Sequence, residues 1–339
     1  GQGQMKIRDP RLLVQSSPLL KQDMTTVQSM RDVIYALLPA TLAGIWLFGL
    51  GALLVLLASI LGAVFIEWIF APPQQRADRL QDASAVLTGL LLGLSLPPAL
   101  PLWMAFLGGA VSIGLGKLIW GGLGQNLFNP ALVGRAFLLA TFPNAMTTWS
   151  SQTHGEGFFQ WYPSNLALPF MQPEYDAVSA ATPLGLMKFE QQPTSLLDLM
   201  LGNSAGCLGE TSGLLLLLGG VYLLLRRDID WRIPAGVLLS VALLSGGLYA
   251  LDAARFPDPL FTLFSGGLLL GAFYMATDPV TSPLTPRGAW IFAIGVGLLV
   301  VLIRLFGGFP EGVMYAILLM NAATPLIDRF IQPRLFGRP

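Results

Sequence analysis

Residues 51–70 form an unbroken apolar run that carries a single charged side chain, Glu67. A helix of this length rises about 1.5 Å per residue and matches the hydrocarbon core of a bilayer, which is about 30 Å thick. Only 11% of the 339 residues are charged, whereas 54% are hydrophobic, so the chain has too few charges to cover a soluble globule of this size. It is therefore predicted to be an all-α polytopic membrane protein.

About ten apolar runs are recognised, five on each side of a long polar segment. We expect spans at 33–50, 51–70, 83–96, 101–120, 131–141, 213–225, 233–251, 261–277, 289–304 and 312–327. The first two are separated only by residues 49–51 (GLG), which predicts a tight helical hairpin. The third is too short to cross a bilayer and ends at Pro97 and Pro98, so it predicts a broken or re-entrant helix. Asn129 and Pro130 predict the N-terminal cap and first residue of the fifth span.

Two short sequences recur in the same order in both halves. TGLLLG at 88–93 matches GGLLLG at 266–271, and KLIWGG at 117–122 matches RLFGG at 304–308. Because five is odd, a second five-span repeat enters the membrane inverted relative to the first. Recurrence of Gly-Leu strings by chance is the alternative. We expect five regions: an N-terminal tail, a first five-helix repeat, a polar segment, a second five-helix repeat and a C-terminal tail, at 1–32, 33–142, 143–212, 213–328 and 329–339.

Most basic residues fall on one side of the membrane if the N-terminus is cytoplasmic. These are Lys6, Arg8, Arg11, Lys21, Arg31, Arg76, Arg79, Lys117, Arg226, Arg227, Arg232, Arg287, Arg329, Arg334 and Arg338. Lys188 and Arg255 remain on the other side, with Arg304 near a span end. The positive-inside rule therefore favours cytoplasmic termini, and residues 143–212 lie on the outer side, the periplasm of a Gram-negative bacterium. Many aromatic residues predict that this segment is folded.

The polar segment holds a hydroxyl among small residues, in DAVSAATP at 176–183. Small side chains would let a bulky planar group lie against the backbone, and Pro183 fixes the chain after Thr182. The sequence resembles the flavinylation motif of the ion-pumping Rnf and Nqr redox complexes, where a flavin transferase esterifies the phosphate of FMN to the threonine. The resemblance implies Thr182 as the attachment site, with Asp176, Ser179 and Ala181 completing the motif. An ordinary small-residue loop is the alternative.

Further stretches extend this resemblance along the chain. They are NPALVGRAF at 129–137, GAFYMATDPVTSP at 271–283, FGGFPEGV at 306–313 and LLMN at 318–321. The chain is thereby identified as a member of the NqrB/RnfD family of membrane subunits. Membership implies an inverted-repeat fold similar to urea transporters, covalent FMN near the outer face, and a bacterial inner-membrane location. It leaves open whether a non-covalent riboflavin is also bound.

The resemblance also implies a function and partners. We expect an electron-transfer subunit of an Rnf-type complex, which couples electron transfer between ferredoxin and NAD to ion translocation, with no complete activity alone. Its partners would be the other Rnf subunits (A, B, C, E and G), the flavin transferase and membrane lipid. The short N-terminal tail favours the Rnf member over the Nqr member, whose electrons go to quinone. A small-solute transporter or channel is the alternative from another class.

Several charged residues lie in or near the spans. Asp278, after the eighth span, either caps a helix, which we favour, or serves as an ion or proton ligand on an ion path. Arg135 either neutralises a flavin anion or belongs to a structural ion pair, and the sequence leaves both open. Glu67, Glu311 and Arg304 lie near span ends, where we expect their side chains to snorkel to the interface.

Composition excludes other classes of site. One cysteine, Cys207, cannot form an internal disulfide, and one histidine, His154, cannot build a His-rich metal site. We expect both side chains to be structural or solvated, and we expect no bound metal. The charges balance, with 19 basic and 19 acidic residues, so no nucleic-acid surface is expected.

Overall fold

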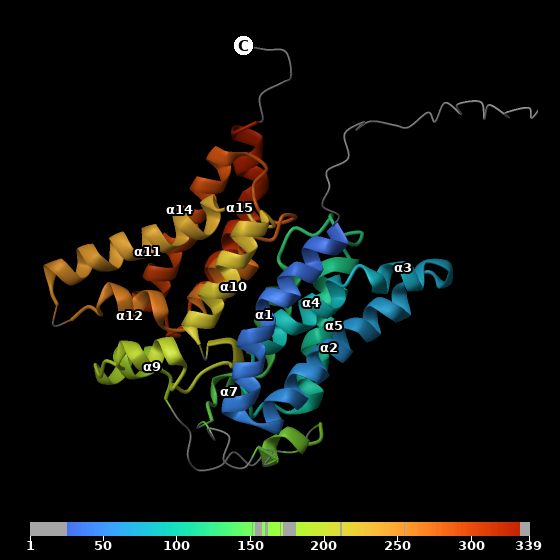
Figure 1. Ribbon diagram of the computed structural model, residues 1–339, viewed down its shortest axis with the longest axis horizontal. Helices are drawn as coiled ribbons and strands as arrows, with labels where there is room; N and C mark the ends of the chain where they lie inside the picture. The colour runs from blue at the N-terminus through green and yellow to red at the C-terminus, as the bar shows by residue number, and fades with distance from the viewer. Residues whose placement is uncertain are drawn as a thin grey trace, which may run out of the picture.

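The computed structural model describes residues 26–150, 152, 158–159, 162–169, 171, 181–210, 212–253 and 255–332. Every regular element in these ranges is a helix (Figure 1). Four helices are long and apolar enough to cross a membrane: α1 (Thr26–Phe48), α2 (Leu50–Phe70), α11 (Arg232–Leu251) and α14 (Pro286–Phe306). The all-helical, multi-pass prediction is confirmed.

Shorter helices complete the bundle. The apolar ones are α4 (Ser84–Leu94), α5 (Leu102–Ile113) with its continuation η2 (Gly114–Leu118), α6 (Pro130–Thr141), α10 (Gly213–Arg226) and the final helix α15 (Val313–Phe330). Small connecting helices are η1 (Pro73–Gln75), α3 (Arg76–Gln81), α7 (Pro143–Thr147), η3 (Pro163–Leu166), α8 (Pro183–Gly185), η4 (Leu186–Glu190), α9 (Leu196–Leu201) and η5 (Leu208–Glu210).

Residues 261–277, which were expected to form the eighth span, do not form one continuous helix. The segment is divided into α12 (Pro259–Phe264), α13 (Leu268–Leu270) and η6 (Gly271–Met275). The interruption falls at residues 265–267, where Gly266 has φ +65°, a conformation that glycine adopts without a Cβ clash. The short helix predicted at 83–96 is present as α4.

The tight hairpin predicted for the first two spans is also wrong. Gly49, with φ +73°, turns the chain between α1 and α2. From there the two helices diverge, because α1 packs mainly against α10 and α4, whereas α2 packs against α5 and α4 (Figure 1). Contact with a helix from the second half of the chain therefore determines the direction of α1.

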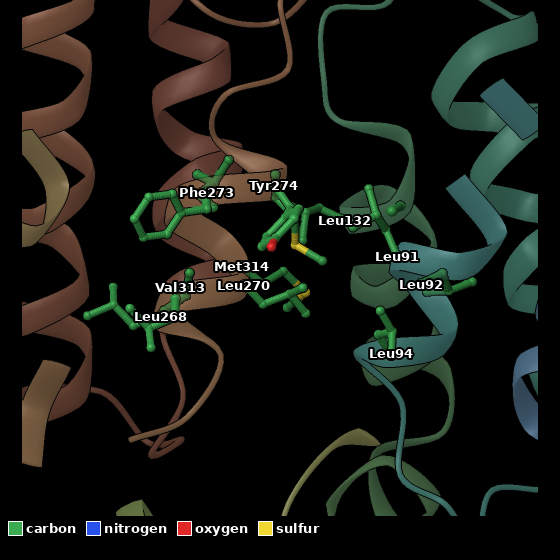
Figure 2. Close-up of a cluster of buried hydrophobic side chains, with 14 of the residues drawn as sticks. Leu91, Leu92, Leu94, Leu132, Leu268, Leu270, Phe273, Tyr274, Val313 and Met314 are labelled. Atoms are coloured by element: carbon green, nitrogen blue, oxygen red, sulfur yellow. The ribbon is translucent and has the colours of Figure 1, made fainter. Parts of the chain in front are cut away.

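The interior joins the two halves through apolar side chains. Leu91 and Leu94 of α4 lie across from residues of α13 and η6, among them Leu270 and Tyr274, whereas Leu92 points away from them, toward α5 (Figure 2). Further contacts between the halves are made by α1 with α10 and by α6 with α15. The two interrupted regions of the chain thus share one hydrophobic core.

Side-chain amides and hydroxyls satisfy the backbone where α4 ends. The Asn165 amide donates to the carbonyls of Pro98 and Leu100 at 3.1 and 2.9 Å, and the Ser164 hydroxyl donates to the carbonyl of Ala99 at 2.7 Å. Both side chains come from η3 in the polar segment. Buried backbone groups that leave a helix need such partners, since water is excluded there.

A second set of amides satisfies the backbone after η6. The Asn129 amide donates to the Met275 carbonyl at 3.1 Å, and the Asn129 N–H donates to the Asn321 side-chain oxygen at 3.2 Å. The Asn321 amide in turn donates to the Thr281 carbonyl at 3.3 Å. Asn129 also caps α6, as predicted, by accepting from the N–H groups of Ala131 and Leu132.

The polar segment and the ends of the bundle lie on opposite sides of the molecule. α7 and α9 lie at the lower end in Figure 1, whereas the start of α1 and the end of α15 lie at the upper end. The described helices of the polar segment thus cover one end of the bundle, which places Thr182 and its neighbours there.

Close packing of α2 on α5 generates a test of this fold. A Cβ on Gly62 would overlap the Phe106 carbonyl oxygen and lie 2.8 Å from its carbon, so Gly62→Ala forces the backbones apart. We expect a loss of about 1–3 kcal/mol, measured as thermal unfolding in detergent. Gly247→Ala in α11 is the matched control, because a Cβ added there would meet no atom within 4 Å. A Gly62→Ala variant as stable as Gly247→Ala would contradict the observed packing.

Candidate functional site

Thr182 lies at the start of α8 and is held by a local hydrogen bond. Its side-chain oxygen accepts from the Gly185 N–H at 3.1 Å, and the residue is 8% exposed. Pro183 occupies the first helical position, where its fixed φ favours helix formation. Of the other motif residues, Ala181 is described, whereas Asp176 and Ser179 lie outside the described residues, as does His154.

A pocket of about 420 Å³ opens beside Thr182, and we call it the Thr182 pocket. Its wall combines Ala181 and Thr182 with Arg135 of α6 and with residues from η4 and α15. Its volume falls within the range of about 300–1,000 Å³ that is typical of small-molecule sites. The structure therefore brings together Thr182 and Arg135, which are 47 positions apart in the sequence (182 − 135).

Aromatic and sulfur-containing side chains line the rest of the Thr182 pocket. Trp149, Phe189 and Phe309 contribute rings, and Met146 and Met314 contribute thioethers. Sequence reasoning assigned none of them to the site, because interfacial aromatic belts give the same composition. Their residue types suit a planar heteroaromatic ligand, since rings stack on such groups and thioethers adapt to them.

A cluster of charged groups begins in the wall of this pocket, with Arg135 and Glu311, and continues behind it. The Arg135 guanidinium donates to the Cys207 sulfur at 3.5 Å and also lies in the field of the Glu210 and Glu311 carboxylates. Glu311 accepts from the Gly267 N–H at 3.1 Å and lies 3.7 Å from Arg304. Arg135 thus lines the pocket and belongs to a charge cluster, so both readings of this residue have a geometric basis.

Burial changes the protonation of two members of this cluster that precede α10. Burial and the nearby Glu311 carboxylate raise the pKa of Glu210 from its ordinary value. Burial also raises the pKa of Cys207 well above that of an exposed thiol, so this cysteine is neutral. The buried position of Cys207 agrees with the structural role expected of it.

The expectation that Glu67, Glu311 and Arg304 snorkel to the interface is wrong for Glu67 and Arg304, and the Glu311 side chain, which is 19% exposed, also has partners within the protein. Glu67 is 1% exposed and accepts from the Lys117 ammonium at 2.9 Å, while Lys117 also donates to the Ser84 hydroxyl at 2.7 Å. Arg304 is 7% exposed and donates to the carbonyls of Thr262 and Ser265. Each residue finds a partner from a distant part of the chain, so neither needs to reach the interface.

Asp278 lies apart from the Thr182 pocket. One carboxylate oxygen accepts from the Val280 N–H at 3.2 Å, and the other accepts from the Thr281 hydroxyl at 3.4 Å, so Asp278 caps a turn rather than a helix. It lines a second pocket, of about 80 Å³, together with Lys117 and Asn129. A role for Asp278 on an ion path stays a prediction.

Comparison with known proteins places this geometry in context. Residues 13–337 match the NQR2, RnfD, RnfE family. The chain is similar to the D subunit of the "Proton-translocating ferredoxin:NAD(+) oxidoreductase complex" of Clostridium ljungdahlii, with 42% identity over 96% of each chain. It is also 42% identical to the D subunit of the "Na(+)-translocating ferredoxin:NAD(+) oxidoreductase complex" of Acetobacterium woodii, over 96% of this chain and 95% of the relative. Identity to the D subunit of the "Ion-translocating oxidoreductase complex" of Stutzerimonas stutzeri is 45% over 91% of each.

The buried Lys117–Glu67 pair generates a prediction. Lys117→Met leaves the Glu67 carboxylate buried without its cation, which should cost about 3–5 kcal/mol of stability. The double variant Glu67→Leu/Lys117→Met removes both charges and should recover most of that loss. Thermal unfolding of the four proteins in this cycle, in detergent, provides the measurement. A single variant with wild-type stability, or a double variant no better than the single, would contradict the pairing.

Proposed function

The chain belongs to the NQR2, RnfD, RnfE family, and on that premise we propose that it is the D subunit of an Rnf-type complex, which couples electron transfer between ferredoxin and NAD to ion translocation. The match covers nearly the whole chain, and each of the three relatives is named as the D subunit of an oxidoreductase complex. The observation that carries the proposal is the position of the Thr182 hydroxyl on the wall of an aromatic-lined pocket that also contains Arg135.

Thr182 is the proposed attachment site of FMN. The residues present fit this group: a hydroxyl at the pocket wall, rings and thioethers around the cavity, and the Arg135 guanidinium, which offsets part of the negative charge of the Glu190 and Glu311 carboxylates that also line it. FMN, when bound, supplies the one-electron and two-electron redox chemistry of the subunit. The Gly185 N–H holds the Thr182 oxygen in place and leaves it a free lone pair. That oxygen would form the phosphoester by attacking the FMN phosphorus of a flavin dinucleotide held by the transferase, with cleavage of the donor's phosphoanhydride bond, departure of the nucleoside monophosphate and loss of the hydroxyl proton. Asp176, Ser179 and Ala181 are proposed to serve recognition by the flavin transferase.

The surrounding residues would bind and shield the cofactor. Trp149, Phe189 and Phe309 provide apolar walls that exclude water, and a low local dielectric strengthens the action of nearby charges. Arg135 supplies the positive charge on the wall and is held by Cys207 within the cluster behind the pocket. We assign Arg135 the role of stabilising the reduced, more negatively charged form of the flavin.

The remaining architecture follows from the same proposal. We place the chain in a bacterial inner membrane, with both ends cytoplasmic and Thr182 on the periplasmic side. The placement of α7 and α9 opposite the start of α1 and the end of α15 supports this topology (Figure 1). The division into two inverted five-helix repeats, similar to urea transporters, is supported by the corresponding packing of α2 on α5 and of α11 on α14.

The alternatives are weaker. The three relatives belong to redox complexes, and two are named for ferredoxin and NAD, which favours the Rnf-type assignment over a quinone-reducing complex and over a solute transporter. The other Rnf subunits (A, B, C, E and G) are the partners in this proposal. The identity of the coupling ion stays open, because the relative named for proton translocation and the relative named for sodium translocation are equally similar to this chain. Riboflavin stays a prediction from resemblance, and the second pocket, at about 80 Å³, is smaller than typical ligand sites.

Removal of the Thr182 hydroxyl tests the attachment. Thr182→Ala should abolish covalent flavin, because no oxygen remains to form the phosphoester, while the membrane fold survives. The measurement is in-gel flavin fluorescence of the denatured chain, with peptide mass spectrometry of the fragment that contains residue 182. Thr147→Ala is the matched control, since Thr147 lines the same pocket. Covalent flavin retained in Thr182→Ala would refute the site.

Removal of the Arg135 charge tests its proposed role. Arg135→Gln should keep covalent flavin but lower its midpoint potential, because the added electron loses a favourable charge. An effect on the order of 1 kcal/mol corresponds to about 40 mV for one electron. Spectroscopic redox titration of the purified chain measures it, and Arg135→Lys, which retains the charge, should recover most of the shift. Equal potentials in wild type and Arg135→Gln would leave Arg135 with a structural role only.

A further inference from the structure

A separate pocket of about 450 Å³ lies among α11, α12, η4 and α14, and we call it the basic pocket. Its lining shares Pro310 with the lining of the Thr182 pocket, and the chain segment 184–191 runs between the two. The proposed electron-transfer function does not use it. Its position beside η4 nevertheless places it at the Thr182 end of the bundle.

Three cations line the basic pocket: Lys188, Arg255 and Arg304. None of the described residues that line it carries a carboxylate. These three are also the basic residues that the positive-inside topology leaves on or near the Thr182 side. Gathering such residues around one cavity produces a local positive potential that attracts an anion.

Arg304 is a buried cation in the wall of this pocket. Its side chain is largely buried, and its two terminal nitrogens donate to the carbonyls of Thr262 and Ser265, with Glu311 3.7 Å from one of them. Its Nε is buried and has no hydrogen-bond partner among the described residues. Arg304 therefore contributes its positive charge to the wall of the pocket, while its Nε is enclosed by protein.

Lys188 and Arg255 contribute the other two charges. The Lys188 ammonium lies at the end of α14 and donates to the carbonyls of Gly307 and Phe309, and partial burial lowers the pKa of this amine. An anion nearby would oppose that shift by favouring the charged form. Arg255 is exposed, and its guanidinium lies 5.7 Å from the centroid of the Phe256 ring, within the range of cation–π contacts.

The walls of the basic pocket are apolar. Leu248, Phe261 and Leu305 line it beside the three cations. On α11 and α14, which form two of its sides, Leu251 is 82% exposed and Phe306 is 79% exposed, as expected of helix faces that contact lipid. A ligand for this site therefore combines an anionic head with hydrocarbon.

We propose that the basic pocket binds the phosphate headgroup of an anionic phospholipid from the leaflet on the Thr182 side. The phosphate oxygens approach the Lys188 ammonium and the Arg255 guanidinium, with Arg304 adding positive charge from the pocket wall, while the acyl chains lie along the exposed apolar faces of α11 and α14. A free phosphate ion satisfies the same donors but leaves the apolar walls without a partner. A segment of a neighbouring subunit is the other occupant that the experiment must distinguish.

The test uses short-chain lipids with the purified full-length chain in detergent. Dihexanoyl phosphatidylglycerol should raise the midpoint of thermal unfolding, followed by tryptophan fluorescence, by about 2–4 °C. Dihexanoyl phosphatidylcholine and inorganic phosphate should give little or no rise. The double variant Lys188→Gln/Arg255→Gln should weaken the apparent Kd by about 25-fold, or about five-fold for each charge. It leaves the contacts of Arg304 within the fold intact.

Control measurements distinguish a bound phospholipid from a free phosphate ion and from a segment of a neighbouring subunit in the basic pocket. Arg287→Gln removes an exposed arginine elsewhere on α14 and should bind phosphatidylglycerol as the wild type does. Equal stabilisation by inorganic phosphate, equal stabilisation by phosphatidylcholine, or wild-type affinity in the double variant would each overturn the proposal. Native mass spectrometry of the assembled complex should show an anionic phospholipid retained by the wild type and lost in the double variant. Absence of that lipid from the wild-type complex would assign the pocket to a neighbouring subunit instead.

Discussion

Helices that stop inside an apolar layer leave carbonyl and N–H groups that water cannot reach, and this constraint organises the centre of the molecule. After α4, the carbonyls of Pro98 and Leu100 are satisfied by Asn165, which comes from the polar segment. After η6, the Met275 carbonyl is satisfied by Asn129, which comes from the other half of the chain. The interrupted helices are therefore stable only when both halves and the polar segment have come together. The fold depends on a small number of amides as well as on its apolar core.

The helix α6 links the Thr182 pocket to the smaller pocket that contains Asp278. Asn129 lines the pocket that contains Lys117 and Asp278, and Arg135 lines the Thr182 pocket. Both residues belong to the first turns of α6 or its cap, six positions apart, which corresponds to about 9 Å along the helix axis. One short helix, fixed at its start by hydrogen bonds to the opposite half, thus extends from a polar pocket to the proposed flavin site. A movement of one half of the chain relative to the other would shift α6 and thereby change the walls of both pockets.

Local signals in the sequence predicted the features that local chemistry controls. The apolar runs indicated the helices, and Asn129 and Pro130 indicated the start of α6. The assignment of Thr182 from the small-residue motif stays a prediction. Features that depend on distant partners were not predictable. Glu67 meets Lys117 from 50 positions away, and α1 packs more extensively against α10, from the other half of the chain, than against its neighbour α2. For the same reason the sequence left open whether Arg135 lies near Thr182, since no spacing rule relates a residue of α6 to one in the polar segment.

The two buried cations give the matching sequence stretches a physical reason. Lys117 begins KLIWGG and Arg304 begins RLFGG, and each lies buried near the end of a helix with an acidic partner, Glu67 for one and Glu311 for the other. An apolar pair of similar volume is often as stable as a buried ion pair, so stability alone does not explain why both positions keep a cation. Each cation instead faces a pocket, Lys117 beside Asp278 and Arg304 in the basic pocket. In the proposed inverted repeat these two positions lie toward opposite membrane surfaces, so each half of the chain supplies a buried positive charge to a pocket on its own side.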